Sequence, residues 1–195
     1  MRIERVWAMP NRWTFTIPPI AQLIKEEMAD TRPWLDPFAG MHSPAHVRND
    51  LNPECNVEYH MDAIDFLQSM DGQKFVGAFF DPPYSFTKAV QCYEHYGKGL
   101  MPNNLTNQNY WAQVKSHIRD LIVGGGKVIS CGWNSNGIGM NRGFQLDRVL
   151  LVAHGSGRND TIVTVETKVQ ATLEEATRPE PSATSTDRGE PEVIP

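Results

Sequence analysis

The sequence is poor in cysteine and has no long apolar run, and each of these absences excludes a class of protein. Only three of the 195 residues are cysteine (Cys55, Cys92 and Cys131), and no two of them form a C-x-x-C pair. We therefore expect neither a disulfide framework nor a zinc site. Since no segment reaches about 18 consecutive apolar residues and the N-terminus has no signal-peptide pattern, we predict a cytoplasmic protein without membrane attachment.

The chain also has little positive charge, with a formal net charge of −5. Residues 171–195 hold six acidic and two basic residues, are rich in Pro, Ser and Thr, and have no aromatic residue. Such a segment buries too little apolar surface to offset its ordering entropy, so we predict a disordered acidic tail after one domain of residues 1–170. The nearly neutral domain predicts weak, salt-sensitive binding to any nucleic acid.

Histidine offers no convincing metal site either. His42 and His46 have helical spacing, but Pro44 lies between them and disfavours an interior helical turn. We interpret both as loop residues and expect no metal.

Helical and strand-like segments alternate along the rest of the chain, which predicts an α/β fold with a mainly parallel sheet. A glycine run at 124–126 is expected to end the last helix, and the final two strands are expected to form an antiparallel hairpin. The helices are predicted at 20–28, 63–70 and 110–123, and the strands at 34–35, 45–48, 57–61, 75–80, 127–131, 146–153 and 161–169.

Carboxylates follow four successive predicted strands, at Asp36, Asp50, Asp62 and Asp81. In an open parallel sheet, ligands bind at the edge formed by the carboxyl ends of the strands. Asp is also a common turn former after strands, which is the alternative explanation. Four in succession favour a ligand site at this edge.

The string Asp81-Pro82-Pro83-Tyr84 follows the apolar segment 75–80 and is the most informative motif of the chain. Two prolines hold a loop extended and leave their carbonyl groups free, and an ionised Asp only accepts hydrogen bonds. Asp81 and the Pro82 carbonyl could together accept both hydrogens of an exocyclic amine, while Tyr84 offers a face on which a base can stack. The alternative is an ordinary Asp-Pro turn.

This motif and the earlier string of residues 36–40 (Asp-Pro-Phe-Ala-Gly) together resemble those of S-adenosylmethionine-dependent amino-methyltransferases. The sequence is most similar to small, phage-type DNA adenine-N6 methyltransferases, which also have counterparts of segments 85–97 and 132–137. The resemblance covers about residues 12–170. It implies a Rossmann-like class I methyltransferase fold and S-adenosylmethionine as cofactor.

The resemblance also assigns roles to residues on the cofactor side. Asp36 would face the methionine moiety, Asp50 would accept from the ribose hydroxyls, and Asp62 from the adenine amine. Gly40 would let the backbone approach the cofactor closely. The cofactor residues implied are Thr16, Asp36, Phe38, Gly40, Asp50, Asp62 and Ile64.

The implied reaction is direct methyl transfer to adenine N6 in double-stranded DNA, with the target base flipped out of the helix. Catalytic roles fall to Asp81, Pro82, Pro83 and Tyr84, without a metal or a covalent intermediate. The substrate contacts implied are Tyr84, Ser85, Phe86 and Lys88, although Phe86 is equally consistent with a core position.

The chain departs from sequence-specific relatives because it has no room for a target-recognition domain. Only about twenty residues separate Asp62 from Asp81. We expect the loop 85–109 to read the target. Alternatively, a partner protein or a homodimer supplies the specificity.

Other functions remain as alternatives at this stage. The acceptor could be an RNA adenine or cytosine N4, or the chain could be a cofactor-binding subunit that needs a partner for activity. A nicotinamide-dependent Rossmann enzyme is disfavoured, because no G-x-G-x-x-G follows the first predicted strand.

Overall fold

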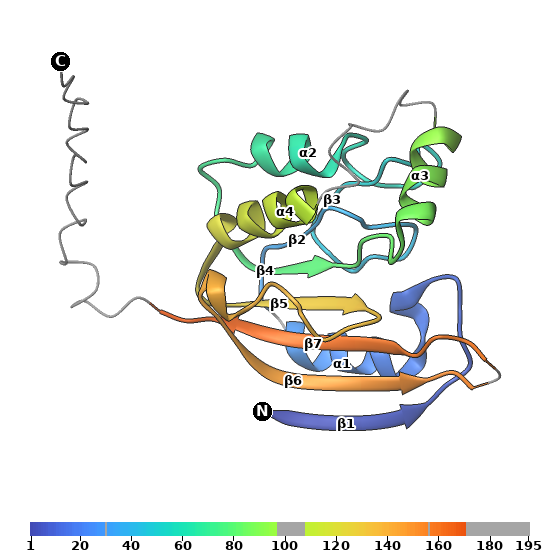
Figure 1. Cartoon of the computed structure of the whole chain (residues 1–195). Coiled ribbons are helices and arrows are strands. Elements are labelled where there is room, and N and C mark those ends of the chain that lie inside the picture. Colours follow the sequence, from blue (N-terminus) through green and yellow to red (C-terminus); the bar gives the residue numbers. More distant parts are fainter. Residues whose placement is uncertain (30, 97–107, 156, 171–195) are drawn as a thin grey trace, which may run out of the picture.

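Seven strands form one sheet in the order β1-β6-β7-β5-β4-β2-β3 (Figure 1). The structure is a computed structural model, and it describes residues 1–29, 31–96, 108–155 and 157–170. Among these strands, only β7 runs antiparallel to its neighbours, β5 and β6. The predicted mainly parallel α/β sheet with a C-terminal antiparallel hairpin is confirmed. The strands are β1 (Arg2–Trp7), β2 (Trp34–Asp36), β3 (Val47–Arg48), β4 (Phe75–Phe80), β5 (Ile122–Gly132), β6 (Phe144–Ala153) and β7 (Thr161–Lys168).

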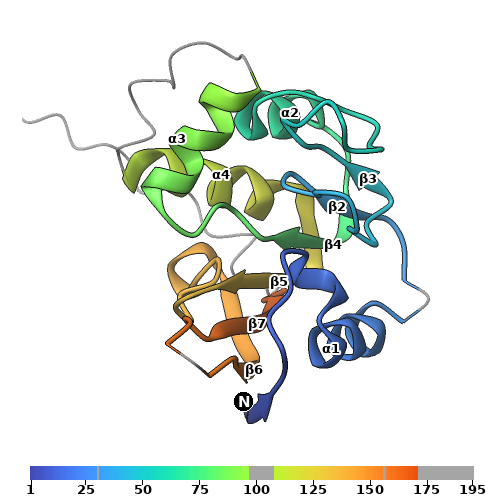
Figure 2. The same cartoon turned by 90° about the vertical axis from the view of Figure 1, so that its right-hand side faces the viewer.

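Helices cover both faces of this sheet, with α1 on one face and α2 and α4 on the other (Figure 2). Helix α1 begins with two prolines, whose fixed φ and missing N–H suit a first helical turn. Its buried face consists of Ile20, Leu23 and Ile24, as the 3.6-residue period predicts. The helices are α1 (Pro18–Met28), α2 (Ala63–Ser69), α3 (Phe86–His95) and α4 (Gln108–Leu121), with 3₁₀ turns at Thr14–Thr16 and Met140–Arg142.

The two faces have separate apolar cores, and strand β4 contributes to both. Ala78 and Phe80 pack in the core beneath α2 and α4, whereas Phe79 packs in the core beneath α1. A strand that is buried on both faces has an unbroken apolar sequence instead of an alternating one. This explains why the segment before the Asp81 motif was recognisable as a strand.

Two sequence predictions were wrong. Residues 57–61 form no strand: Tyr59 makes only an isolated bridge with Asn49, where Tyr59 N donates to Arg48 O. The glycines at 124–126 do not end α4, which stops at Leu121. They lie inside β5, where the pairing with β4 shifts register, because glycine accommodates such an irregularity.

Two elements were not predicted. Strand β1 pairs in parallel with β6 at the edge of the sheet, and it alternates without a clear apolar face. Helix α3 occupies the first part of what we expected to be the loop 85–109, which corrects that expectation. Residues 97–107 of that loop and the predicted tail 171–195 lie outside the described residues. None of the described helices is both long and apolar enough to cross a membrane.

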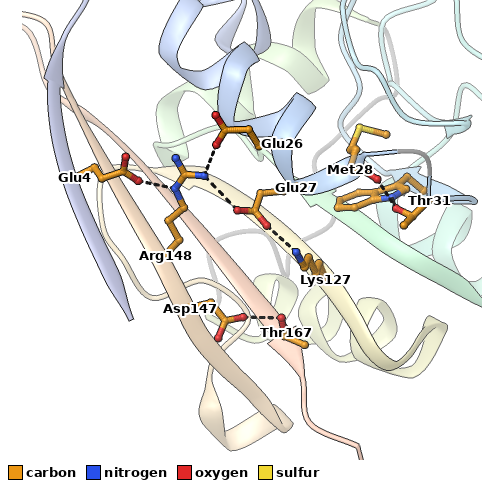
Figure 3. Close-up of polar contacts among 10 residues, drawn as sticks. Glu4, Glu26, Glu27, Met28, Thr31, Lys127, Asp147, Arg148 and Thr167 are labelled. Atoms are coloured by element: carbon orange, nitrogen blue, oxygen red, sulfur yellow. Dashed lines mark hydrogen bonds and ion pairs between the residues drawn. The ribbon is translucent and has the colours of Figure 1, made fainter.

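A network of ion pairs joins β1, β5, β6 and α1 (Figure 3). The Arg148 guanidinium, whose side chain is only 12% exposed, donates to Glu4 at 2.6 Å, to Glu26 at 2.8 Å and to Glu27 at 3.2 Å. Lys127 also pairs with Glu27, at 2.7 Å. Arg148, on β6, thus ties the edge strand β1 and the helix α1 to the neighbouring strand of the sheet.

Replacing Arg148 with Met should lower the free energy of unfolding by about 2 kcal/mol, because three carboxylates then lose a shared, largely buried partner. Urea denaturation at pH 7 measures this. The control is Arg2→Met, since Arg2 pairs with Glu4 through a side chain that is 67% exposed. We expect little change there. Equal effects of the two substitutions would contradict the assigned role of the network.

Candidate active site

The Asp81-Pro82-Pro83-Tyr84 loop leaves the carboxyl end of β4 and stands between two cavities. The first cavity, of about 290 Å³, lies towards the loops after β2 and β3 and towards α3. The second cavity, of about 280 Å³, lies towards the loop after β5 and towards α4. Pro82, Pro83, Tyr84 and Trp111 line both cavities. The motif is therefore the wall between two adjoining sites.

Asp81 lines the first cavity and is held by Tyr84. The Tyr84 hydroxyl donates to Asp81 Oδ1 at 2.5 Å, and it lies 3.5 Å from Thr14 Oγ1. Burial raises the pKa of Asp81 to about 6, although the hydrogen bonds from Tyr84 and Thr14 oppose this. The result is a carboxylate in a low-dielectric site that ionises close to neutral pH.

Asp36 is completely buried, and its carboxylate holds the loop that follows β2. Oδ1 accepts from the Phe38 N–H at 2.9 Å, and Oδ2 accepts from the Ser43 hydroxyl at 2.6 Å. Burial raises the pKa of Asp36 to about 7. Phe38 lines the first cavity but Asp36 does not, so Asp36 shapes the wall from behind.

Asp50 lines the first cavity and also fixes Gly40. Asp50 Oδ2 accepts from the Gly40 N–H at 2.7 Å, and Oδ1 accepts from the Asn52 N–H at 2.8 Å. Gly40 has a φ of +55°, a conformation that side chains disfavour, while the space around it is open. Gly40 itself does not line the cavity.

Asp62 caps the N-terminus of α2 and receives three donors. Oδ1 accepts from the Ile64 N–H at 2.8 Å, and Oδ2 accepts from the hydroxyls of Tyr93 and, at 2.9 Å, of Tyr110. Burial raises the pKa of both tyrosines, so both remain donors. The tyrosines line the first cavity, whereas Asp62 and Ile64 do not.

Asn49 was not predicted, yet it is 1% exposed and joins three loops. Its Nδ2 donates to Pro37 O at 3.1 Å and to Met61 O at 3.0 Å, and its Oδ1 accepts from Met61 N at 3.0 Å. Asn49 also lines the first cavity. Its position directly after β3 is the signal that could have identified it.

The remaining predicted residues differ in their relation to the cavities. Lys88 on α3 lines the first cavity, and Ser85 caps that helix by accepting from the Lys88 N–H at 3.3 Å. Phe86 is the first residue of α3, and its side chain lies outside the described part. Thr16 bonds within its own turn, to Trp13 O at 2.9 Å, while Thr14 reaches the first cavity.

Aromatic and polar side chains line the second cavity. The rings of Tyr84 and Trp133 meet edge to face, with 5.7 Å between their centroids. Lys115 and Ser130 also line this cavity. The loop bearing Trp133 is anchored by Glu166, whose carboxylate accepts from Ile138 N at 2.6 Å and Gly139 N at 2.9 Å. Sequence reasoning missed Lys115 and Glu166 because neither belongs to the motif strings.

Among the described residues, no group of three or more His, Cys, Asp or Glu side chains could hold a metal ion. The side chains that line the two cavities include carboxylates, hydroxyls, aromatic rings and the amines of Lys88 and Lys115.

Comparison of the fold with solved structures identifies its class. The chain is similar to the N-methyltransferase NodS from Bradyrhizobium japonicum WM9 (8% identity, TM-score 0.52, covering 77% of this chain and 94% of NodS). It is also similar to the 1,6-didemethyltoxoflavin-N1-methyltransferase of Burkholderia thailandensis, solved with 1,6-didemethyltoxoflavin and S-adenosylhomocysteine. The identity is 12% and the TM-score is 0.52, and the match covers 78% of this chain and 77% of that enzyme. The predicted Rossmann-like class I methyltransferase fold is thereby confirmed.

A third similar structure is TrmN from Thermus thermophilus (17% identity, TM-score 0.50, covering 78% of this chain). The matched part spans 49% of TrmN, about half its length. No protein-family profile matches the sequence, and no curated protein matches it either. At these identities the similarity defines the fold, and the chemistry has to be argued from the site.

Replacing Asn49 with Ala should lower the free energy of unfolding by roughly 2–4 kcal/mol, because Pro37 O, Met61 O and Met61 N would lose their hydrogen bonds to this buried side chain. Urea denaturation measures the loss. Asn52→Ala is the matched control, since the Asn52 side chain only accepts from Glu54 N at an exposed position. If the two variants were equally stable, Asn49 would not be the residue that holds these loops together.

Proposed function

We propose that this chain transfers a methyl group from S-adenosylmethionine to the exocyclic N6 of adenine in DNA. The observation that carries the proposal is the Asp81-Pro82-Pro83-Tyr84 loop standing between two cavities of similar size. A transfer between two bound molecules requires two adjoining sites with the reacting atoms at their boundary. The class I methyltransferase fold supports a methyl donor in one of them.

The first cavity is the proposed cofactor site. Its volume of about 290 Å³ is close to the lower limit of about 300 Å³ that is usual for small-molecule sites. Asp50 lines it at the end of β3, where an acidic residue could accept from ribose hydroxyls. A solved enzyme of similar fold holds S-adenosylhomocysteine, which supports the same class of cofactor here.

The target amine would lie beside Asp81 and the Pro82 carbonyl, each of which accepts one N6 hydrogen. Accepting both hydrogens withdraws the nitrogen lone pair from the ring and directs it at the sulfonium methyl. The bond from the donor's sulfur to the methyl carbon would break as N6 bonds to that carbon, which would leave S-adenosylhomocysteine, and the proton that N6 then loses would pass to solvent. These hydrogen bonds strengthen as N6 gains positive charge, so they stabilise the transition state more than the ground state.

Labelled methyl transfer tests this proposal directly. S-adenosylmethionine with a labelled methyl group is incubated with unmethylated duplex DNA, and the product is mapped at single-base resolution. Wild type should place label on adenine N6, and Asp81→Ala should reduce the rate at least about 100-fold, since the loss of a charged acceptor costs several kcal/mol in the transition state. Asp71→Ala, at an exposed turn after α2, is the matched control and should retain wild-type activity.

Other products would redirect the assignment. Label on RNA adenine but not on DNA would replace DNA by RNA as substrate, and label on cytosine N4 would replace the target base. Cofactor binding without transfer to any nucleic acid would favour a subunit that needs a partner. Full activity in Asp81→Ala would remove the motif from the reaction.

The pH dependence of kcat/KM gives an independent test. Burial raises the pKa of Asp81 to about 6, and the proposed role requires the ionised form. Activity should therefore be constant above about pH 7 and fall about tenfold for each pH unit below 6. Asp81→Asn should abolish this dependence in whatever activity remains. A profile that stays flat down to pH 5 would show that ionised Asp81 is not required.

A further inference from the structure

Lys115 lies on α4 and lines the second cavity, but the mechanism above gives it no role. Its side chain is half-buried, and its Nζ stands 5.4 Å from the centroid of the Phe80 ring. Within the described part of the chain, no carbonyl, carboxylate or hydroxyl group accepts a hydrogen bond from this ammonium. A cation over an aromatic face is attracted to it, but its three N–H donors are left without acceptors.

The charged groups around Lys115 do not supply the missing acceptor. Glu166 attracts the ammonium electrostatically, but the N–H groups of Ile138 and Gly139 occupy its two oxygens. Burial lowers the pKa of Lys115, and the nearby positive charge of Arg142 lowers it further. The protein thus keeps an amine in a partly dry position where its charged form is poorly compensated.

A second polar group on the same cavity wall also lacks a partner. Ser130 is 5% exposed, and its hydroxyl has no hydrogen-bond partner among the described residues. Ser130 pairs with Phe80 across β5 and β4, so it lies next to the ring beneath Lys115. Buried polar groups are nearly always hydrogen-bonded in folded proteins. The buried Ser130 hydroxyl and the half-buried Lys115 amine, both without a partner among the described residues and both lining one cavity, therefore point to a ligand that completes their hydrogen bonds.

We propose that the second cavity binds the ring of the target base, and that Lys115 donates a hydrogen bond to one of its ring nitrogens. The inference rests on the proposed function and names the residue that would position the base. Tyr84 and Trp133 offer aromatic faces for a planar heterocycle at this cavity. The Trp133 residue is 42% exposed, so its ring is accessible to a ligand. Adenine carries ring nitrogens with free lone pairs on edges that a lysine on the cavity wall can reach.

The aromatic walls favour a base over a phosphate group as the acceptor. A phosphate is strongly hydrated and would lose water against the rings of Phe80, Tyr84 and Trp133. Among the described residues, no second cation lines this cavity to compensate for that loss. The nearby Arg142 donates instead to Ile138 O, Ser116 Oγ and Ala112 O. A ring nitrogen needs only one donor. The base is therefore the occupant that matches both the apolar walls and the single amine.

Binding of nucleosides tests the inference separately from catalysis. The protein is saturated with S-adenosylhomocysteine, so that the first cavity is blocked, and is titrated by calorimetry or NMR with adenosine and with 1-, 3- and 7-deazaadenosine. Lys115→Met, which keeps the length of the side chain but removes the donor, should bind adenosine about tenfold more weakly. One of the deaza analogues, which lacks the ring nitrogen that Lys115 contacts, should bind wild type about tenfold more weakly than adenosine does. On Lys115→Met, the same analogue should bind as well as adenosine does.

Two further variants make the result interpretable. Lys74→Met removes an exposed lysine that bonds to Asp120 O and lines neither cavity, and this variant should bind adenosine as wild type does. Lys115→Arg keeps a cationic donor and should retain more affinity than Lys115→Met. Urea denaturation of each variant shows whether it is folded, and Lys115→Arg serves if Lys115→Met is not.

The outcomes separate this inference from the proposed function. If wild type binds adenosine and Lys115→Met binds it equally well, the inference is overturned while adenine methylation stands. If all three deaza analogues bind wild type as well as adenosine does, the ammonium does not contact a ring nitrogen, and the inference also fails. If wild type binds no nucleoside, the assignment of adenine as substrate fails with it.

Discussion

The geometry of the first cavity depends on the hydrogen bonds that the Asn49 carboxamide makes to the backbone of two loops. Strand β3 has only two residues, and residues 57–61 form a single bridge instead of a strand, so backbone ladders hold little of this side of the sheet. Asn49 replaces the missing ladder by joining the backbone of Pro37 to that of Met61. Because both partners lie beside the cavity wall, one side chain sets the separation of the loops that would enclose a cofactor.

The carboxylates at the strand ends divide into two kinds. Asp36 and Asp62 hold backbone and hydroxyl donors and do not line the first cavity, whereas Asp50 and Asp81 do. Asp36 is costly to ionise because it is completely buried, and its pKa is raised to about 7. Because a raised pKa means that the folded state binds the proton more tightly, the stability due to Asp36 is complete below about pH 4 and is lost as the pH rises through about 7. The pKa of Asp81 is also raised, so the stability due to Asp81 is likewise lost as the pH rises through about 6. The proposed reaction needs ionised Asp81. The site would therefore work in the pH range in which Asp81 contributes least to the stability of the fold.

The sequence predicts those parts of the structure that have a local cause. Strand β4 is apolar throughout because both faces are covered, and α1 shows a helical period after two prolines. The position of the Asp81 loop follows from β4, which ends directly before it. Strand β1 could not be predicted in the same way, because it is held by pairing with β6, more than 140 residues further along the chain. Lys115 likewise looks like a solvent-facing residue of a helix until the fold places Phe80 and Ser130 beneath it.

On the proposed function, the two prolines of the motif matter as much as its carboxylate. A loop that separates two binding sites has to keep its position whether one, both or neither is filled, and every freedom it retains lowers the population in which the reacting atoms are aligned. Pro82 and Pro83 each fix one φ angle, and the Tyr84 hydroxyl fixes the Asp81 carboxylate from the other end of the loop. The orientation is therefore built before any ligand arrives, so binding energy is not spent on ordering the wall. Such a preformed wall can align a base that is held only by short-range contacts in the second cavity.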